Sequence, residues 1–246
     1  MKSIILAGLI ALSGTLYAQN SIPIGTIVPV QTDFSLSKKT KSGERIAARV
    51  MQDVPLGNGT KIPQGSRLIG EVIAVPAPGA SSASVSFRFD RLVIRHRSTP
   101  VKTDLRALAS PLDIDDAQLP EYGGDRGTPS TAYTTTQIGG DQTVYRGGGH
   151  VENNSGIVGE PVEDGILGPA RPNGDGDCRG PVGGNGRPQA FWLFATDACG
   201  IYGYNGVKIL NAGRDKPAGE ITLASERGEL NIRSGSGMLL RVIGSD

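Results

Sequence analysis

Two short groups of acidic residues come nearest to a spacing that could bind a metal ion or carry out acid–base chemistry. One group is Asp113, Asp115 and Asp116, and the other is Asn173, Asp175 and Asp177. The second group has the N-x-D-x-D spacing that begins a calcium-binding loop, because Ca²⁺ prefers carboxylate and amide oxygens as ligands. However, Cys178 stands where such a loop requires glycine, and Gly184 stands in place of the bidentate glutamate. We therefore keep a non-standard calcium site as a candidate beside a plain solvated acidic loop, and assign no other metal site.

The acidic residues also leave open a hydrolase, since paired carboxylates serve as acid and base in glycoside hydrolysis. No G-x-S-x-G nucleophile motif is present. The two histidines, His96 and His150, are not placed with both cysteines or with carboxylates at the spacing of a zinc site. We therefore predict that the chain is not an enzyme, with no catalytic residue, no cofactor-binding residue and no cofactor.

Cys178 and Cys199 are the two cysteines of the chain. An even number of cysteines in an exported protein predicts a disulfide, because oxidising compartments allow the bond to persist. Closing a loop of this size should stabilise the fold by about 3 kcal/mol. Two unpaired thiols are the alternative.

The first 18 residues predict export. Lys2 gives a short positive start, residues 4–12 form an apolar run, and a short polar stretch leads to Ala18 and Gln19. This three-part layout is typical of a secretory signal peptide, and the run is too short for a bilayer, which needs about 20 apolar residues. We predict cleavage between Ala18 and Gln19, a periplasmic or secreted mature protein, and no transmembrane helix after cleavage.

Residues 19–110 contain apolar and β-branched runs separated by turn signals, which predicts a series of β-strands. The clearest is residues 84–97, where Val85, Phe87 and Phe89 alternate with polar residues in the period of two of a half-buried strand. The alternation then changes phase, so we expect a β-bulge near Asp90. Further strands are expected after residue 189, and signals for helices are almost absent.

Residues 111–188 differ in composition, since they hold 18 of the 36 glycines and 8 of the 16 prolines. Such a segment has too little apolar surface to offset the entropy lost on ordering. We predict a flexible insert, either a long loop or a largely disordered segment, in which residues 131–138 or 143–145 could form short strands. The whole pattern predicts an all-β barrel or sandwich, in which an N-terminal unit (residues 19–110) and a C-terminal unit (residues 189–246) complete one domain.

Charge is distributed unevenly along the chain. Residues 19–110 carry 13 Lys and Arg against 6 Asp and Glu, a net charge of +7, whereas residues 111–188 carry 5 against 12, a net charge of −7. The two parts should attract each other or contact separate partners, and solvated faces without a partner are the alternative. Nucleic-acid binding is disfavoured, because the mature chain is close to neutral and its basic residues are not interleaved with stacking aromatic residues.

Several stretches have the form of a family motif. Residues 62–70 read IPQGSRLIG, residues 97–100 read RSTP and residues 110–113 read SPLD. With residues 24–50 and the last strand at 235–242, they resemble the β-domain of the TrbI-like scaffold proteins of conjugation and type IV secretion. The resemblance implies a β-barrel that acts as a scaffold in an envelope complex.

The chain departs from that family at two places. Members typically carry an N-terminal membrane helix and two helices within the barrel domain. Here a predicted signal peptide leads directly into the β-domain, and the insert is glycine-rich and acidic. We therefore expect a relative with the β-barrel domain only, lacking the membrane anchor and the helical insert.

Three functions follow as hypotheses. The favoured one is a structural or assembly role in the cell envelope, with other envelope proteins or further copies of the chain as partners. The second is a binding module whose insert presents Tyr122, Tyr133 and Tyr145 to a ligand. The third is the hydrolase with an acidic site.

Overall fold

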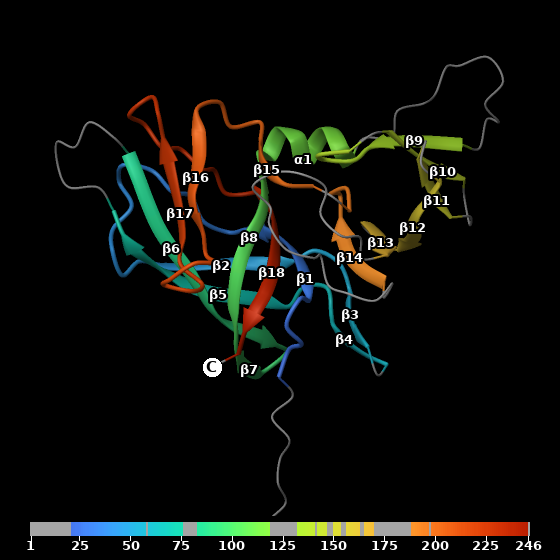
Figure 1. Ribbon diagram of the computed structural model, residues 1–246, viewed down its shortest axis with the longest axis horizontal. Helices are drawn as coiled ribbons and strands as arrows, with labels where there is room; N and C mark the ends of the chain where they lie inside the picture. The colour runs from blue at the N-terminus through green and yellow to red at the C-terminus, as the bar shows by residue number, and fades with distance from the viewer. Residues whose placement is uncertain are drawn as a thin grey trace, which may run out of the picture.

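The computed structural model describes most of the chain after the predicted signal peptide. The described residues are 21–57, 59–75, 83–118, 132–140, 142–146, 150–153, 156–162, 165–169, 188–196 and 198–245. They form two larger sheets, one hairpin and one helix (Figure 1).

The larger sheet has ten strands and curls into a nearly closed barrel. Nine of its strands follow one another in the order β15-β8-β18-β1-β2-β5-β6-β17-β16, and β7 pairs with β6. Their bounds are β1 Ile27–Thr32, β2 Arg45–Val50, β5 Arg67–Ala74, β6 Ala83–Ile94, β7 Arg97–Pro100, β8 Lys102–Ala109, β15 Gly200–Tyr202, β16 Val207–Ala212, β17 Ile221–Ser225 and β18 Gly237–Gly244. Beside it lies the hairpin of β3 (Val54–Gly57) and β4 (Thr60–Ile62).

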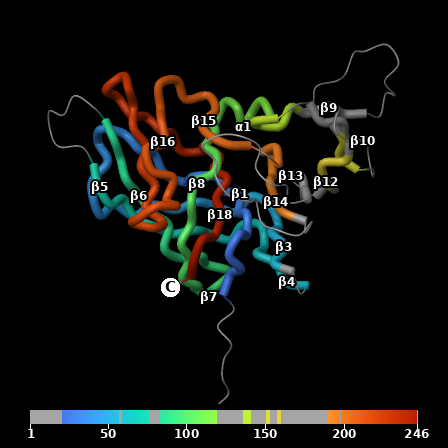
Figure 2. Tube along the Cα trace, in the orientation of Figure 1, coloured from blue at the N-terminus to red at the C-terminus, as the bar shows by residue number. Residues whose placement is uncertain are grey.

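The two ends of the chain build this barrel together. Strand β18 pairs antiparallel with β1 on one side and with β8 on the other. Figure 2 shows it in red between the blue β1 and the green β8. The all-β fold made from N-terminal and C-terminal strands is therefore confirmed, and the barrel is the form it takes.

Alternating side chains fill the barrel. Phe34, Phe87 and Phe89 pack edge to face, with ring centroids 5.9 to 6.3 Å apart, an arrangement that aromatic quadrupoles favour. The register between β5 and β6 shifts where Ile69 pairs with Arg91 and Gly70 with Phe89. The β-bulge predicted near Asp90 is thus confirmed. We call the apolar cluster inside the barrel the barrel core.

An ion-pair group closes the barrel where strand pairing ends. Within the described residues, β16 has no strand partner on the side that faces β8. Arg214, just after β16, and Arg241 of β18 each donate from Nε to Oδ2 of Asp104 at 3.0 Å. The Asp104 side chain is only 1% exposed, so these charge-assisted hydrogen bonds are shielded from water and hold the seam.

The described part of residues 111–188, where a long loop was expected, instead forms a helix and most of a second, smaller sheet. The expectation of a loop is corrected accordingly. The chain first forms helix α1 (Pro111–Gln118), and then strands in the order β14-β13-β12-β11-β10-β9. Their bounds are β9 Ala132–Thr136, β10 Gln142–Arg146, β11 Val151–Asn153, β12 Gly156–Val162, β13 Gly165–Pro169 and β14 Pro188–Trp192. Backbone hydrogen bonds between neighbouring strands do not require apolar side chains, so glycine-rich segments can pair in this way.

A second apolar cluster attaches the insert to the barrel. On β18, Met238 and Leu240 belong to the barrel core, whereas Leu239 points to the opposite face of the sheet. That outer face is covered by residues of α1, of β14 and of the chain around Ile138. We call this group the outer cluster; its members are Ile27, Ala107, Ala109, Ile114, Ala117, Ile138, Phe191, Trp192, Phe194, Ala195, Ala198 and Leu239.

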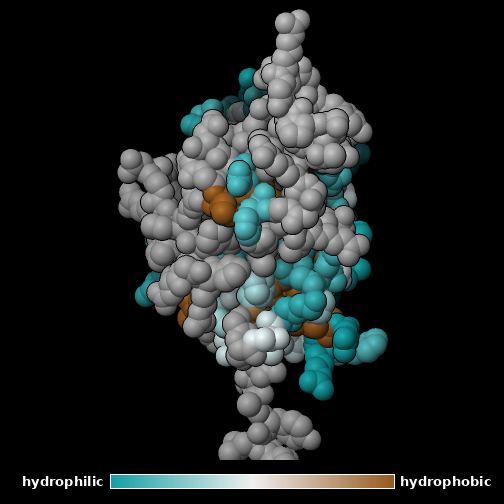
Figure 3. Space-filling view, turned by 90° about the vertical axis from the view of Figure 1, so that its right-hand side faces the viewer, coloured by the Kyte–Doolittle hydropathy of each residue, from teal (hydrophilic) through white to brown (hydrophobic). Residues whose placement is uncertain are grey.

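The exposed large apolar side chains of the described residues come from four separate segments. They are Ile24, Leu112, Ile157 and Leu210. On the side shown in Figure 3, the described surface is mainly hydrophilic with small hydrophobic areas. In the described part of the chain, no helix has the length and apolar character needed to cross a bilayer.

Candidate functional site

Helix α1 begins at a capping box formed by Ser110 and Asp113. The Asp113 amide donates to Oγ of Ser110 at 3.3 Å, and that hydroxyl donates to Oδ2 of Asp113. Pro111 takes the first helical position, where its missing N–H costs nothing. The Ser110 amide donates to the Tyr202 carbonyl at 3.1 Å, so the start of the helix is fixed to β15.

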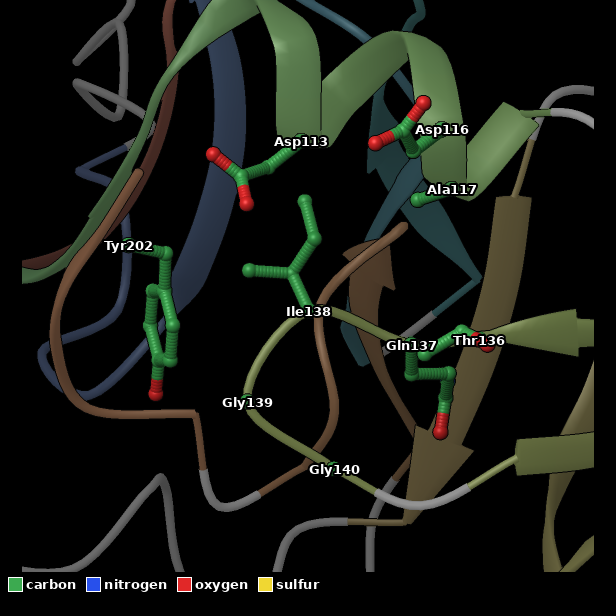
Figure 4. Close-up of a pocket in the computed structure, with 9 residues that line it drawn as sticks. All are labelled: Asp113, Asp116, Ala117, Thr136, Gln137, Ile138, Gly139, Gly140 and Tyr202. Atoms are coloured by element: carbon green, nitrogen blue, oxygen red, sulfur yellow. The ribbon is translucent and has the colours of Figure 1, made fainter. Parts of the chain in front are cut away.

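A cleft of about 720 Å³ opens beside this helix, where the barrel meets the insert (Figure 4). Three segments line it: α1, the chain at residues 136–140, and β15. The lining residues are Asp113, Asp116, Ala117, Thr136, Gln137, Ile138, Gly139, Gly140 and Tyr202.

Backbone hydrogen bonds fix the wall formed by residues 136–140. The Ile138 amide donates to the Leu193 carbonyl at 2.9 Å, and the Ala195 amide donates to the Ile138 carbonyl at 2.9 Å. The buried Gln137 side chain donates from Nε2 to the Phe194 carbonyl at 3.5 Å. The wall is therefore held by the same segment that supplies the aromatic side chains of the outer cluster.

Tyr202 forms the opposite wall and is itself held in place. Its hydroxyl accepts from the Cys199 amide at 2.9 Å and donates to the Cys199 carbonyl at 2.8 Å. Gly139 approaches this hydroxyl so closely that a Cβ atom there would lie 2.3 Å from it. Because Gly139 also has a φ of 77°, glycine is the residue that fits this position.

Two acidic side chains and one tyrosine line the cleft, and both kinds of group attract cations. Asp113 and Asp116 lie one turn apart on α1, so both carboxylates face the same side of the helix. An aromatic ring adds a face that attracts cations, and guanidinium groups suit both partners. Asp113 is partly occupied by Ser110, so Asp116, which is exposed, is the freer carboxylate.

The structure brings together only part of the first acidic group found in the sequence. Asp113 and Asp116 both line the cleft, whereas Asp115 is exposed on the same helix and is not a lining residue. His96 lies at the tip of the hairpin between β6 and β7, and His150 is exposed just before β11. Among the described residues, no three His, Cys, Asp or Glu side chains are grouped so that they could hold a metal ion.

Other predicted site residues lie outside the described part of the chain. They include the calcium candidates Asn173, Asp175 and Asp177, the cleavage site at Ala18 and Gln19, and Tyr122. Cys199 is described, but Cys178 is not, so their pairing stays a prediction. The side chains of Tyr133 and Tyr145 are likewise outside the described residues.

Neither α1 nor the contribution of Tyr202 to the site was predicted from the sequence. The signal for the helix was present, since Ser110-Pro111-x-Asp113 is a capping box with proline at the first helical position. Tyr202 carries no such local signal. It reaches the cleft because β15 pairs in parallel with β8, a contact between distant segments.

Comparison of the sequence with protein-family models and with curated proteins finds no match.

Proposed function

We propose that this protein is an exported β-barrel of the cell envelope with a structural or assembly role, similar to that of the TrbI-like scaffold proteins. It acts in the periplasm or outside the cell, and its partners are other envelope proteins or further copies of itself. The proposal assigns no catalytic residue.

The observation that carries the proposal is the convergence of the stretches that resemble that family. Residues 24–50 form β1 and β2, residues 62–70 lead into β5, and residues 235–242 form most of β18. Strand β1 lies between β18 and β2, and β2 pairs with β5. Stretches far apart in the sequence therefore become four neighbouring strands of one barrel wall.

The residues of the IPQGSRLIG stretch serve the architecture of that wall. The Gly65 amide donates to the Val50 carbonyl at 2.8 Å, and the Val50 amide donates to the Ser66 carbonyl at 2.7 Å. At Gly70, a Cβ atom would lie 1.9 Å from the Arg88 carbonyl oxygen, so only glycine allows β6 to approach at the bulge. These roles fit a scaffold, because the motif forms turns and strand contacts.

The outer face of β2, β5 and β6 supports an assembly role. Arg49 and Arg67 both pair with Asp33, at 3.5 and 2.8 Å, and Arg88 pairs with Glu71 at 2.6 Å. These arginine side chains remain about half exposed, between 50% and 56%. The acidic partners of these three arginines, Asp33 and Glu71, belong to the same N-terminal unit. The face therefore stays open to a partner, and exposed arginine is common at protein interfaces.

The test is the native size of the protein in the envelope of cells that produce it with its own N-terminal segment. We expect a processed chain beginning at Gln19, and a complex much larger than one chain on native gels after mild chemical crosslinking. A chain that starts at residue 19 with a new initiating methionine is the matched control, and it should stay in the cytoplasm outside the complex. An exported chain that migrates only as a monomer would contradict the assembly role.

A binding module is the second candidate, because the insert supplies one wall of the cleft. Its test is a titration with spermidine and with arginine methyl ester, followed through the amide resonances of Gly139 and Gly140. Saturable shifts that disappear in Asp116→Asn would favour binding of a small cation. An unchanged spectrum with both compounds would remove this candidate.

A further inference from the structure

A basic hairpin tip projects from the barrel between β6 and β7. Ile94 pairs with Arg97, so Arg95 and His96 form a two-residue loop. Arg95, His96 and Arg97 are all exposed. In the described part of the chain, neither arginine takes part in an ion pair.

Arg95 adopts a backbone conformation that usually belongs to glycine. Its φ is 56°, in the left-handed region that non-glycine residues rarely enter. A two-residue hairpin loop commonly places glycine where φ is positive. A strained residue of this kind is a reason to look for a function, and here the strain sets a guanidinium group at the end of a hairpin.

An unpaired acidic group lies at the far end of the molecule. Figure 1 shows α1 at the top and β7 at the bottom. Asp115 and Asp116 are exposed on α1, and no described lysine or arginine pairs with them. Leu112, which is 68% exposed, lies on the same face one turn earlier. This acidic end therefore combines carboxylates, one apolar side chain and the cleft.

The two ends are complementary in charge and in shape. A hairpin tip is convex, whereas the acidic end is hollowed by a cleft of about 720 Å³ between α1 and residues 136–140. Guanidinium groups form paired hydrogen bonds with carboxylates and stack on aromatic rings such as that of Tyr202.

We infer that the hairpin tip at residues 95–97 of one copy inserts into the cleft beside α1 of a second copy. The inference rests on the proposed assembly role, since it names the chain itself as a partner. The hairpin tip of one molecule cannot reach the cleft of the same molecule, because the two lie on opposite sides of the barrel. Such a head-to-tail contact generates a ring if the rotation closes and a filament if it does not.

The decisive experiment is charge reversal with complementation, measured by sedimentation velocity on the purified mature chain. The wild-type protein should associate increasingly with concentration, and less so in high salt, which screens exposed charges. Arg95→Glu with Arg97→Glu should weaken association by about 10- to 100-fold. Asp115→Arg with Asp116→Arg should do the same, and Asp113 is left unchanged because its carboxylate holds the capping hydroxyl of Ser110 at the start of α1.

Mixing the two variants separates this contact from a general effect of charge. The reversed acidic end of one chain meets the reversed tip of the other, and the wild-type tip of the first meets the wild-type acidic end of the second. The mixture should therefore associate as the wild type does. Lys38→Glu with Lys39→Glu is the matched control, since it changes the same charge at another exposed site and should leave association unchanged.

Three results would overturn the inference. They are a wild-type chain that stays monomeric at all concentrations, single variants that associate normally, and a mixture that does not recover association.

A pure chain that is monomeric but still enters a large complex in the envelope would reject self-association and keep the assembly role. A pure chain that associates but is monomeric in the envelope would reject the proposed function. Saturation of the cleft by spermidine without any association would show that the cleft takes a small cation instead.

Discussion

The barrel core and the outer cluster are equally buried but are built in different ways. The barrel core comes from strands in which inward and outward side chains alternate, as in β6 with Val85, Phe87 and Phe89. The outer cluster comes from short, unrelated pieces: helix α1, strand β14 and the turn at Ile138. The difference shows that one sheet can serve two cores, because its two faces are buried against different parts of the chain.

Loss of β18 and loss of the insert should have unequal effects on the two cores. Strand β18 supplies Met238 and Leu240 to the barrel core and Leu239 to the outer cluster, so both cores need it. The insert contributes mainly to the outer cluster. The barrel should therefore survive loss of the insert, and neither core should survive loss of β18.

The largest effect is expected from deletion of residues 220–246, which removes β17 and β18. Strands β1 and β8 would lose their common neighbour and expose unpaired edges. Since a domain has only about 5–15 kcal/mol of stability, we expect no cooperative unfolding transition by circular dichroism or calorimetry, and aggregation of the product.

The contrasting variant replaces residues 114–176 by a short Gly-Ser linker and keeps both cysteines. It removes Ile114, Ala117 and Ile138 from the outer cluster, so we expect a lower midpoint but a cooperative transition. A linker variant that no longer unfolds cooperatively, beside a truncated chain that does, would show that the insert organises the fold.

The sequence was informative where side chains follow a fixed period and less so elsewhere. The period-two pattern of residues 84–97 predicted β6 and even its bulge, because a half-buried strand requires alternation. The amount of regular structure in the insert was underestimated. The pairing of β9 to β13 depends on backbone hydrogen bonds, and a glycine-rich sequence has no side-chain pattern that would predict them. For the cleft, Asp113 and Asp116 were visible as acidic residues, but Tyr202 joins them only through the parallel pairing of β15 with β8.

A pair of phenylalanine substitutions measures each core separately. Phe87 lies in the barrel core and Phe194 in the outer cluster, and both are fully buried. Each change to alanine should lower the free energy of unfolding by about 3–5 kcal/mol. Chemical denaturation monitored by circular dichroism gives both values. A much smaller loss for Phe194→Ala would mean that the outer cluster forms no part of the cooperative unit.

Reduction of the predicted Cys178–Cys199 disulfide should give the next largest loss of stability. It would join the end of the insert to the segment beside the cleft, where the backbone of Cys199 holds the hydroxyl of Tyr202. Non-reducing peptide mapping of exported protein should find the linked peptides, and reduction should cost about 3 kcal/mol of stability. Two free thiols in that material would contradict the pairing.

The smallest effect on stability should come from a change at Asp53, next to the β3–β4 hairpin. Hydrogen bonds from the Lys61 side chain and then from the Gln64 amide, 2.8 Å from Oδ1, lower the pKa of Asp53 below its ordinary value. A lowered pKa means that the folded state binds the proton less tightly than the unfolded chain. The stabilisation is therefore complete above the unfolded value near 4 and is lost as the pH falls through the folded value.

The size of that effect is limited by solvent. The side chains of Asp53 and Lys61 are 44% and 59% exposed, and exposed pairs contribute less than about 1 kcal/mol. Asp53→Asn should therefore lower stability slightly at pH 7, and its difference from the wild type should vanish as the pH falls below about 4. Glu229→Gln breaks a pair whose side chains are both 75% exposed and should show no measurable change. If the Asp53→Asn difference persists unchanged to low pH, the ionised carboxylate is not the group that stabilises this hairpin.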